Sequence, residues 1–305
     1  MNLKRAYTVA VIGAALWGII GLFVARLYQF GFTPWEVVAI RVISSFIVMF
    51  IYLIVFKPKL LKIKIKDSIY FIGTGICSIV FFNWCYFEVI NKSSLSLAVI
   101  LLYTGPLFVA LMSRIIFKEK LTVLKILALI FTLAGCAFVV GILPKYHVSI
   151  SWYVLIIGLG SGFCYALYSI FGKYVSSKYS SLTITFYSFL FASLFMIPAG
   201  GLWRKSEAFG QWQVLLCIFG LALIPTCLAY ILYTYGLSYI ESSRASILAT
   251  VEPVVAIIIG VAVLGDALSV WQFIGIIFVL VSILLTTKKT KMYEDNKGIK
   301  QQNLM

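Results

Sequence analysis

The stretch SLAVILLYTGP at residues 96–106 recurs 147 residues later as SRASILATVEP at residues 243–253. Five of the eleven positions are identical. The same offset continues without a gap on both sides and pairs, for example, Tyr86 with Tyr233. The chain therefore contains an internal duplication, and any fold assigned to it must consist of two similar halves.

The composition is that of an integral membrane protein. Of the 305 residues, 62% are hydrophobic and 11% are charged, whereas soluble domains are about 45–50% apolar and about 25% charged. A soluble fold would leave much of this apolar surface exposed, but lipid covers such surface. The net charge of +15 comes from Lys and Arg in short loops between apolar runs. This pattern indicates membrane topology rather than a nucleic-acid partner.

Ten apolar runs are long enough to cross a bilayer, since a helix of about 20 residues spans the hydrocarbon core. They lie near residues 7–27, 35–56, 68–90, 94–117, 122–142, 152–174, 181–202, 212–238, 243–264 and 271–287. We therefore expect an all-α membrane protein with one five-helix repeat at 6–142 and a second at 152–287. The polar tail at 288–305 is expected to be disordered and cytoplasmic.

Because five is an odd number, the second half must enter the membrane from the opposite face. With both termini in the cytoplasm, 19 Lys and Arg residues fall in inner segments and 5 in outer segments, as the positive-inside rule requires. Lys118 and Lys120 correspond to the uncharged Gly265 and Ala267 in the second half. The sequence thus predicts an inverted-topology repeat, an architecture common among secondary transporters, in the plasma membrane of a bacterium.

Several short motifs accompany the two five-helix halves. They are Trp17-Gly18 in the first span, the small-x-small helix starts before Pro106 and Pro253, and the turns FKEKL at 117–121 and LGDAL at 264–268. In these features the chain resembles the EamA-type permeases of the drug/metabolite transporter superfamily over residues 6–287. The resemblance implies a ten-helix permease with a central cavity that opens alternately to either side. It does not imply one substrate, since the family moves amino acids, other metabolites and drugs.

One acidic residue lies midway along a predicted span. Glu252 stands next to Pro253, which removes a backbone hydrogen bond and frees a nearby carbonyl. A charged group at the bilayer centre costs about 2.5–3.5 kcal/mol on insertion scales, and such residues face a cavity or a partner. Glu252 is therefore either a site for a substrate amine or a coupling proton, or a protonated carboxyl bonded to a neighbouring helix.

Arg41 lies about two turns into the second span. Its planar guanidinium suits the carboxylate of a substrate. The alternative, which charges near a membrane surface usually adopt, is an ion pair with Glu36 or Glu88.

Polar and aromatic residues follow matched faces of the two halves. Asn83 and Tyr86 lie three residues apart, so they share a helix face, and their counterparts Tyr230 and Tyr233 do the same. Aromatic walls with a few polar groups suit an organic solute. The residues predicted to line a central cavity are Trp17, Asn83, Tyr86, Tyr103, Tyr165, Tyr168, Tyr230, Tyr233 and Glu252. For any single one of these residues, packing between helices or a position in the interfacial belt is the commoner role.

Three prolines, Pro106, Pro225 and Pro253, lie within spans. Neighbouring helices in a membrane can satisfy the backbone groups that proline leaves free. These prolines are predicted kink points for gating, or they only shape static packing.

The predicted function is secondary transport of a small organic metabolite, amino-acid-like or similar, by alternating access, with export as the expected direction. The alternatives are an uptake permease of the same fold and a non-enzymatic receptor or scaffold, which would not require a duplicated antiparallel design. The sequence has no HExxH, P-loop or GxSxG motif, so we expect no enzyme activity, no cofactor and no metal. The expected partners are the substrate, the lipid bilayer and a coupling proton.

Overall fold

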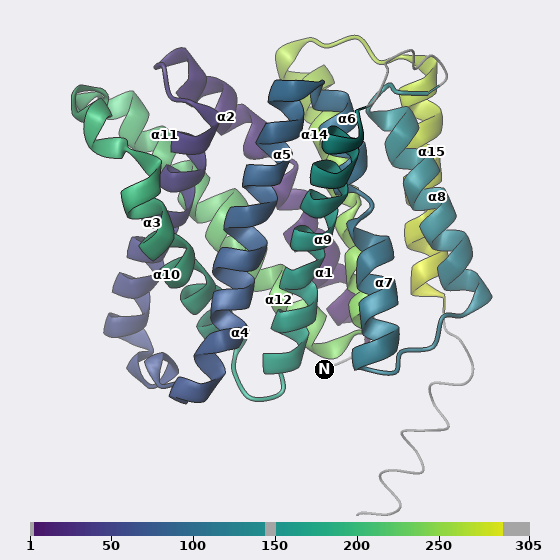
Figure 1. Ribbon diagram of the computed structural model, residues 1–305, viewed down its shortest axis with the longest axis horizontal. Coiled ribbons are helices and arrows are strands. Elements are labelled where there is room, and N and C mark those ends of the chain that lie inside the picture. Colours follow the sequence, from purple (N-terminus) through teal and green to yellow (C-terminus); the bar gives the residue numbers. More distant parts are fainter. Residues whose placement is uncertain (1–2, 144–150, 289–305) are drawn as a thin grey trace, which may run out of the picture.

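The computed structural model describes residues 3–143 and 151–288, and every regular element within these ranges is a helix (Figure 1). Nine of the described helical segments are long and apolar enough to cross a membrane, and a tenth, α8 (Val123–Val139), is apolar but shorter. This confirms the predicted all-α membrane fold. The predicted tail, apart from Lys288, lies outside the described residues.

The two halves contain similar but not identical successions of elements. The first half comprises α1 (Leu3–Trp17), α2 (Ile20–Gln29), α3 (Pro34–Phe56), α4 (Ser68–Ile72), a π-helical segment (Gly73–Val80), α5 (Phe81–Lys92), α6 (Leu95–Leu102), α7 (Gly105–Ile116) and α8. The second comprises α9 (Trp152–Val175), α10 (Ser181–Gly200), α11 (Trp212–Ala222), a π-helical segment (Leu223–Leu228), α12 (Ala229–Tyr239), α13 (Ser242–Ala249), α14 (Val251–Ile259) and α15 (Val270–Thr287).

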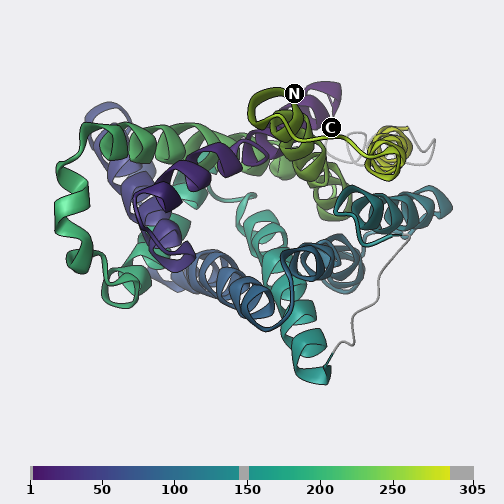
Figure 2. The ribbon, with the colours of Figure 1, turned by 90° about the horizontal axis from the view of Figure 1, so that it is seen from above.

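Helices of one half pack against helices of the other, and the pairings repeat under the 147-residue offset. The helix α1 packs against α12, and its counterpart α9 packs against α5. The helices α3 and α10, which are counterparts, pack against each other, and so do α8 and α15. Seen from above, elements of both halves surround a common centre, with α8 and α15 side by side at one edge (Figure 2). Such mutual packing is what an inverted repeat requires.

Small residues allow α8 and α15 to approach closely. A Cβ atom at Gly275 would lie 2.7 Å from the carbonyl oxygen of Gly135, and one at Gly135 would lie 3.0 Å from that of Gly275. Beside them, the Thr132 hydroxyl donates to the Ser282 hydroxyl at 3.1 Å. Close backbone approach and interhelical hydrogen bonds stabilise helix pairs in lipid, where the hydrophobic effect between helices is absent.

The start of the first helix and the end of the last lie at the same end of the molecule (Figure 1). The Arg244 guanidinium joins them: it donates to the Tyr7 hydroxyl at 3.1 Å and to the Thr286 carbonyl at 2.5 Å. We call this the terminus end. The opposite end, where α6 and α15 begin, we call the far end. An even number of membrane crossings accounts for this placement.

Two spans break where the sequence places proline. The helix α6 ends at Leu102, four residues before Pro106, and α13 ends at Ala249, four residues before Pro253. A proline ring clashes with the carbonyl four residues earlier, which explains both endpoints. The span α1–α2 also breaks, after Trp17, where no proline is present and no break was predicted.

The third helix of each half widens into a π-helical segment. In the second half this segment contains Pro225, and the Thr226 hydroxyl donates at 2.7 Å to the Leu221 carbonyl, which Pro225 leaves without its amide partner. In the first half, Gly73–Val80 widens without any proline. There a Cβ at Gly75 would lie 2.4 Å from the Ser188 carbonyl oxygen, so close packing against α10 requires glycine. No feature of the sequence predicted this segment.

Candidate functional site

Glu252 lies in the first turn of α14, directly after the break at Thr250. Its side chain is partly buried, and no hydrogen bond or ion pair joins it to another described residue. The amide groups at the start of α14 favour a negative charge at this position. The structure therefore places a mid-span carboxyl group at the break of a discontinuous helix, an arrangement found at the binding sites of secondary transporters.

Arg41 lies in α3 with 9% of its surface exposed, and its Nε atom has no hydrogen-bond partner among the described residues. Neither acid considered in the sequence pairs with it. The Glu36 carboxylate accepts the Thr33 amide at 2.7 Å in a helix cap, and Glu88 accepts the Tyr153 hydroxyl at 3.1 Å. Arg41 and Glu252 attract each other electrostatically but form no direct ion pair.

Four of the predicted tyrosines lie close enough to Glu252 to interact with its charge. They are Tyr86 of α5, Tyr103 at the α6–α7 break, Tyr165 of α9 and Tyr230 of α12. Tyr86 and Tyr165 are partly exposed, whereas Tyr103 and Tyr230 are buried. Elements of both halves therefore meet around this carboxyl group.

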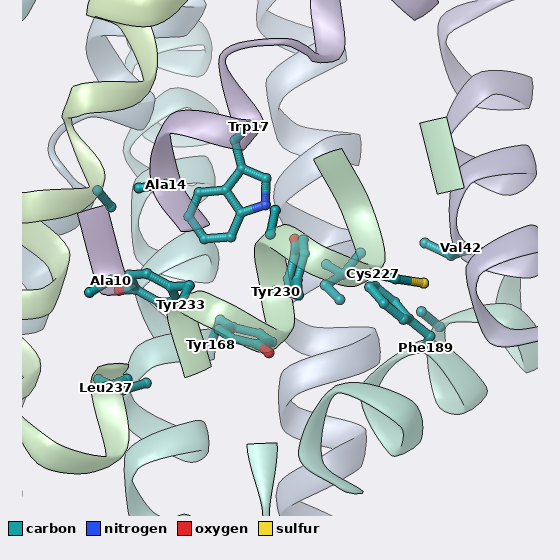
Figure 3. Packing of buried hydrophobic residues seen from close by; sticks show 14 of the residues in the cluster. Ala10, Ala14, Trp17, Val42, Tyr168, Phe189, Cys227, Tyr230, Tyr233 and Leu237 are labelled. Carbon is teal, nitrogen blue, oxygen red and sulfur yellow. The ribbon is translucent and has the colours of Figure 1, made fainter. Parts of the chain in front are cut away.

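Trp17 packs into the same region from the end of α1. Its ring centroid lies 5.1 Å from that of Tyr230 and 5.0 Å from that of Tyr233, and Tyr168 lies beside them (Figure 3). The indole Nε1 atom is buried and has no hydrogen-bond partner among the described residues. An unpaired buried donor costs about 1–3 kcal/mol, so the fold leaves a costly unsatisfied donor beside these tyrosines.

Three of the predicted site residues have their polar groups satisfied inside the protein. The Tyr168 hydroxyl shares a hydrogen bond of 2.7 Å with the Thr234 hydroxyl, and Tyr233 does the same with Ser169. The Asn83 amide donates at 2.7 Å to the Ile79 carbonyl of the π-helical segment that precedes α5. All three predicted residues are at most 5% exposed. Their contacts are those of residues that pack between helices and support the site.

The internal repeat shows how residues at equivalent positions of the site differ between the two halves. Glu252 corresponds to Gly105, and Gly18 corresponds to Tyr165 under the same offset. In one of these two equivalent contacts, the Tyr165 ring of the second half packs on Gly105 of the first, with 2.9 Å between its Cδ1 atom and the position of a Cβ there. In the other contact, Gly18 of the first half packs on the Glu252 backbone of the second, with 2.6 Å between a Cβ position and the carbonyl oxygen. Sequence reasoning missed this pair of glycines, although the repeat register contained the signal.

Comparison with known proteins agrees with the repeat. The EamA-like transporter family matches residues 4–141 and 151–288, two segments separated by the offset of 147 residues. The threonine/homoserine exporter RhtA of Escherichia coli strain K12 is 29% identical over 78% of this chain and 79% of its own length. An uncharacterized transporter of Archaeoglobus fulgidus is 29% identical over 67% of this chain and 71% of its own.

A solved crystal structure shares the fold. It superposes with a TM-score of 0.76, covers 93% of this chain and 96% of its own, and is 15% identical in sequence. Since the family matches both halves and nearly all of the chain, the protein belongs to the EamA-like transporter family of the drug/metabolite transporter superfamily.

Proposed function

We propose that this family member is a secondary transporter that exports a small, amino-acid-like metabolite by alternating access, with the repeats 6–142 and 152–287 as its two units. The observation that carries the proposal is a pair of opposite charges, Glu252 and Arg41, that lie within spans and have no direct partner among the residues that the structure describes. Charges in the membrane interior are costly and mark substrate or ion pathways.

A zwitterionic solute complements this pair. Its ammonium group would donate to the Glu252 carboxylate, and its carboxylate would accept the fork of the Arg41 guanidinium. The apolar part would pack against Trp17, Tyr86 and Tyr165. Bound in this way, the solute would satisfy both protein charges at once, which neither a purely apolar drug nor a simple cation could do.

Two further observations support the details of the proposal. A relative similar over most of the chain is named as an exporter of threonine and homoserine, both zwitterions. The loops at the terminus end are rich in Lys and Arg, which favours a cytoplasmic terminus end and cytoplasmic chain ends. In the absence of a bound amine, Glu252 would take up a proton and so couple export to the proton gradient.

The first prediction concerns Glu252→Gln. In liposomes loaded with a mixed pool of amino acids and other metabolites, the wild-type protein should release zwitterionic compounds when a proton gradient is imposed. Glu252→Gln should abolish this efflux, because the amide carries no charge and takes up no proton, while the protein stays monodisperse. Glu88→Gln is the matched control and should transport normally.

Three outcomes would contradict the proposal. Full efflux by Glu252→Gln would remove this carboxyl group from the mechanism. Retention of every compound by a folded wild-type protein would favour a receptor or scaffold. Accumulation of a compound against its gradient in the opposite direction would instead identify an uptake permease.

A further inference from the structure

A carboxylate from the first half holds a helix of the second half at the terminus end. Glu119, in the loop before α8, accepts the backbone amides of Ser242 at 2.7 Å and Ser243 at 3.2 Å, as well as the Ser243 hydroxyl. These amides begin α13, whose own N-cap residue, Glu241, makes no capping hydrogen bond through its side chain. Ser242 and Ser243 are completely buried. The first two amides of α13 are therefore capped from the other half of the chain.

The ammonium group of a lysine binds the end of α12, the helix that precedes α13. The Lys173 ammonium of α9 donates to the carbonyls of Leu237 at 2.9 Å, Ser238 at 3.3 Å and Ile240 at 2.6 Å. These carbonyls end α12. The hairpin formed by residues 237–244 is thus fixed by an acid at a helix start and a base at a helix end, as both helix dipoles favour.

Ion pairs surround this hairpin. The Lys125 ammonium lies 3.1 Å from Glu241 and 3.8 Å from Glu119, and the Arg244 Nε atom lies 2.6 Å from Glu241. The Lys125 side chain is 3% exposed. The hairpin at the terminus end is therefore held by a buried network that includes residues of both halves.

The far end carries the counterparts of the two holding residues. Asp266 corresponds to Glu119, and its loop has the same unusual backbone: φ is +76° at Gly265 and +55° at the equivalent Lys118. Asp266 is exposed, however. Its Oδ2 atom lies 2.7 Å from the position of a Cβ at Gly260 and so rests against its own span. The same loop thus engages a helix start at one end of the molecule and not at the other.

Arg26, the basic counterpart at the far end, likewise binds no end of a helix of the other half among the described residues. Arg26 corresponds to Lys173, but it is exposed, donates to the Gln29 side chain at 2.7 Å and lies over the Phe30 ring. The hairpin that corresponds to 237–244 is 90–97. There Leu95, the counterpart of the buried Ser242, is 59% exposed, and α6 is capped by its own Ser94.

We propose that Glu119 and Lys173 form a two-point lock that closes the terminus end, and that Asp266 and Arg26 form the equivalent lock of the far end. In the opposite state, Asp266 accepts the amides of Leu95 and Ser96, and Arg26 donates to the carbonyls that end α5. The structure is then the state closed at the terminus end. This inference rests on the proposed alternating access, since only a protein with two access states needs two locks.

Spin labels on repeat counterparts measure both ends without any substrate. One pair replaces Lys120 and Tyr239 at the terminus end, and the other replaces Ala267 and Lys92 at the far end; all four positions are exposed. In lipid, wild-type protein should show mainly a short distance for the first pair and a long distance for the second. Glu119→Gln should raise the population ratio of terminus-end-open to terminus-end-closed protein about tenfold. The far-end pair should then shorten in the same fraction of molecules.

The matched variant is Asp266→Asn, which should leave the terminus end closed to at least the wild-type extent. Lys173→Met and its counterpart Arg26→Met repeat the comparison at the basic residues, so the test does not depend on one variant folding. Unchanged distances in both Glu119→Gln and Lys173→Met would overturn the lock. Equal shifts in a variant and in its counterpart variant, for both the acidic and the basic residues, would also overturn it. If the distances shift as expected while no metabolite leaves liposomes, the lock stands and the proposed transport function falls. Normal efflux with unchanged distances removes the lock alone.

Discussion

Two charged side chains and two glycines define the centre of this protein at the scale of residues. Glu252 and Arg41 could be identified from the sequence, because ionisable residues within apolar spans stand out. Their surroundings could not be predicted, because the close approach of Gly18 to Glu252 arises only when the halves pack together. The packing role of Tyr168 could not be predicted either, because its hydroxyl finds its hydrogen-bond partner, Thr234, only in the folded protein.

Arg41→Lys tests whether Arg41 binds a carboxylate through its planar fork. Lysine keeps the charge but offers a compact ammonium in place of two parallel donors. We expect the concentration for half-maximal efflux of a zwitterion to rise about tenfold, which corresponds to the loss of one charge-assisted hydrogen bond. Liposome efflux over a range of internal concentrations measures it. Unchanged half-saturation would show that Arg41 does not bind the solute with its fork.

Gly18→Ala tests the contact between α1 and α14. The added methyl group would lie 2.6 Å from the Glu252 carbonyl oxygen and 2.7 Å from the Val255 Cβ atom. Overpacking of this kind costs about 1–3 kcal/mol, so we expect a lower thermal unfolding midpoint in detergent and slower efflux. Gly21→Ala is the control, since nothing lies within 4 Å of a Cβ at that position. Equal midpoints for the two variants would contradict the packing described here.

At the scale of elements, proline explains some irregularities but not others. The ends of α6 and α13 follow directly from Pro106 and Pro253, and the sequence predicted kinks there. The π-helical segment at Gly73–Val80 and the break after Trp17 contain no proline and depend on packing between halves. Local sequence therefore predicted the spans and two of their breaks, and tertiary contacts determined the remainder. The role of these prolines in gating stays a prediction.

Thr226→Val tests how the π-helical segment around Pro225 is stabilised. Valine has nearly the same shape but lacks the hydroxyl that donates to the Leu221 carbonyl. Because hydrogen bonds between such groups in membrane proteins contribute about 0.6–1.7 kcal/mol, we expect a small but measurable decrease in thermal stability in detergent. Thr287→Val removes a comparable bond at an exposed site and should have a smaller effect. A larger loss in Thr287→Val would contradict this account.

At the scale of the whole molecule, the sequence predicted the duplication and the inverted halves correctly, because the repeat register and the loop charges are both one-dimensional signals. It did not predict that the two ends differ. Glu119 and Asp266 occupy equivalent loops with similar backbones, yet one is buried against a helix start and the other is exposed. The proposed alternating access requires such asymmetry of any single conformation, and sequence alone does not select the conformation.

The mechanism depends on the two halves lying antiparallel in the membrane, and labelling of the repeat counterparts Lys120 and Ala267 tests this arrangement most directly. Each residue is exposed, one at the terminus end and the other at the far end. In a background whose six native cysteines are replaced by alanine, Lys120→Cys and Ala267→Cys are treated with a membrane-impermeant maleimide, in intact cells and after permeabilisation. We predict that Ala267→Cys reacts in intact cells and that Lys120→Cys reacts only after permeabilisation. Reaction of both cysteines from the same side would contradict the antiparallel arrangement.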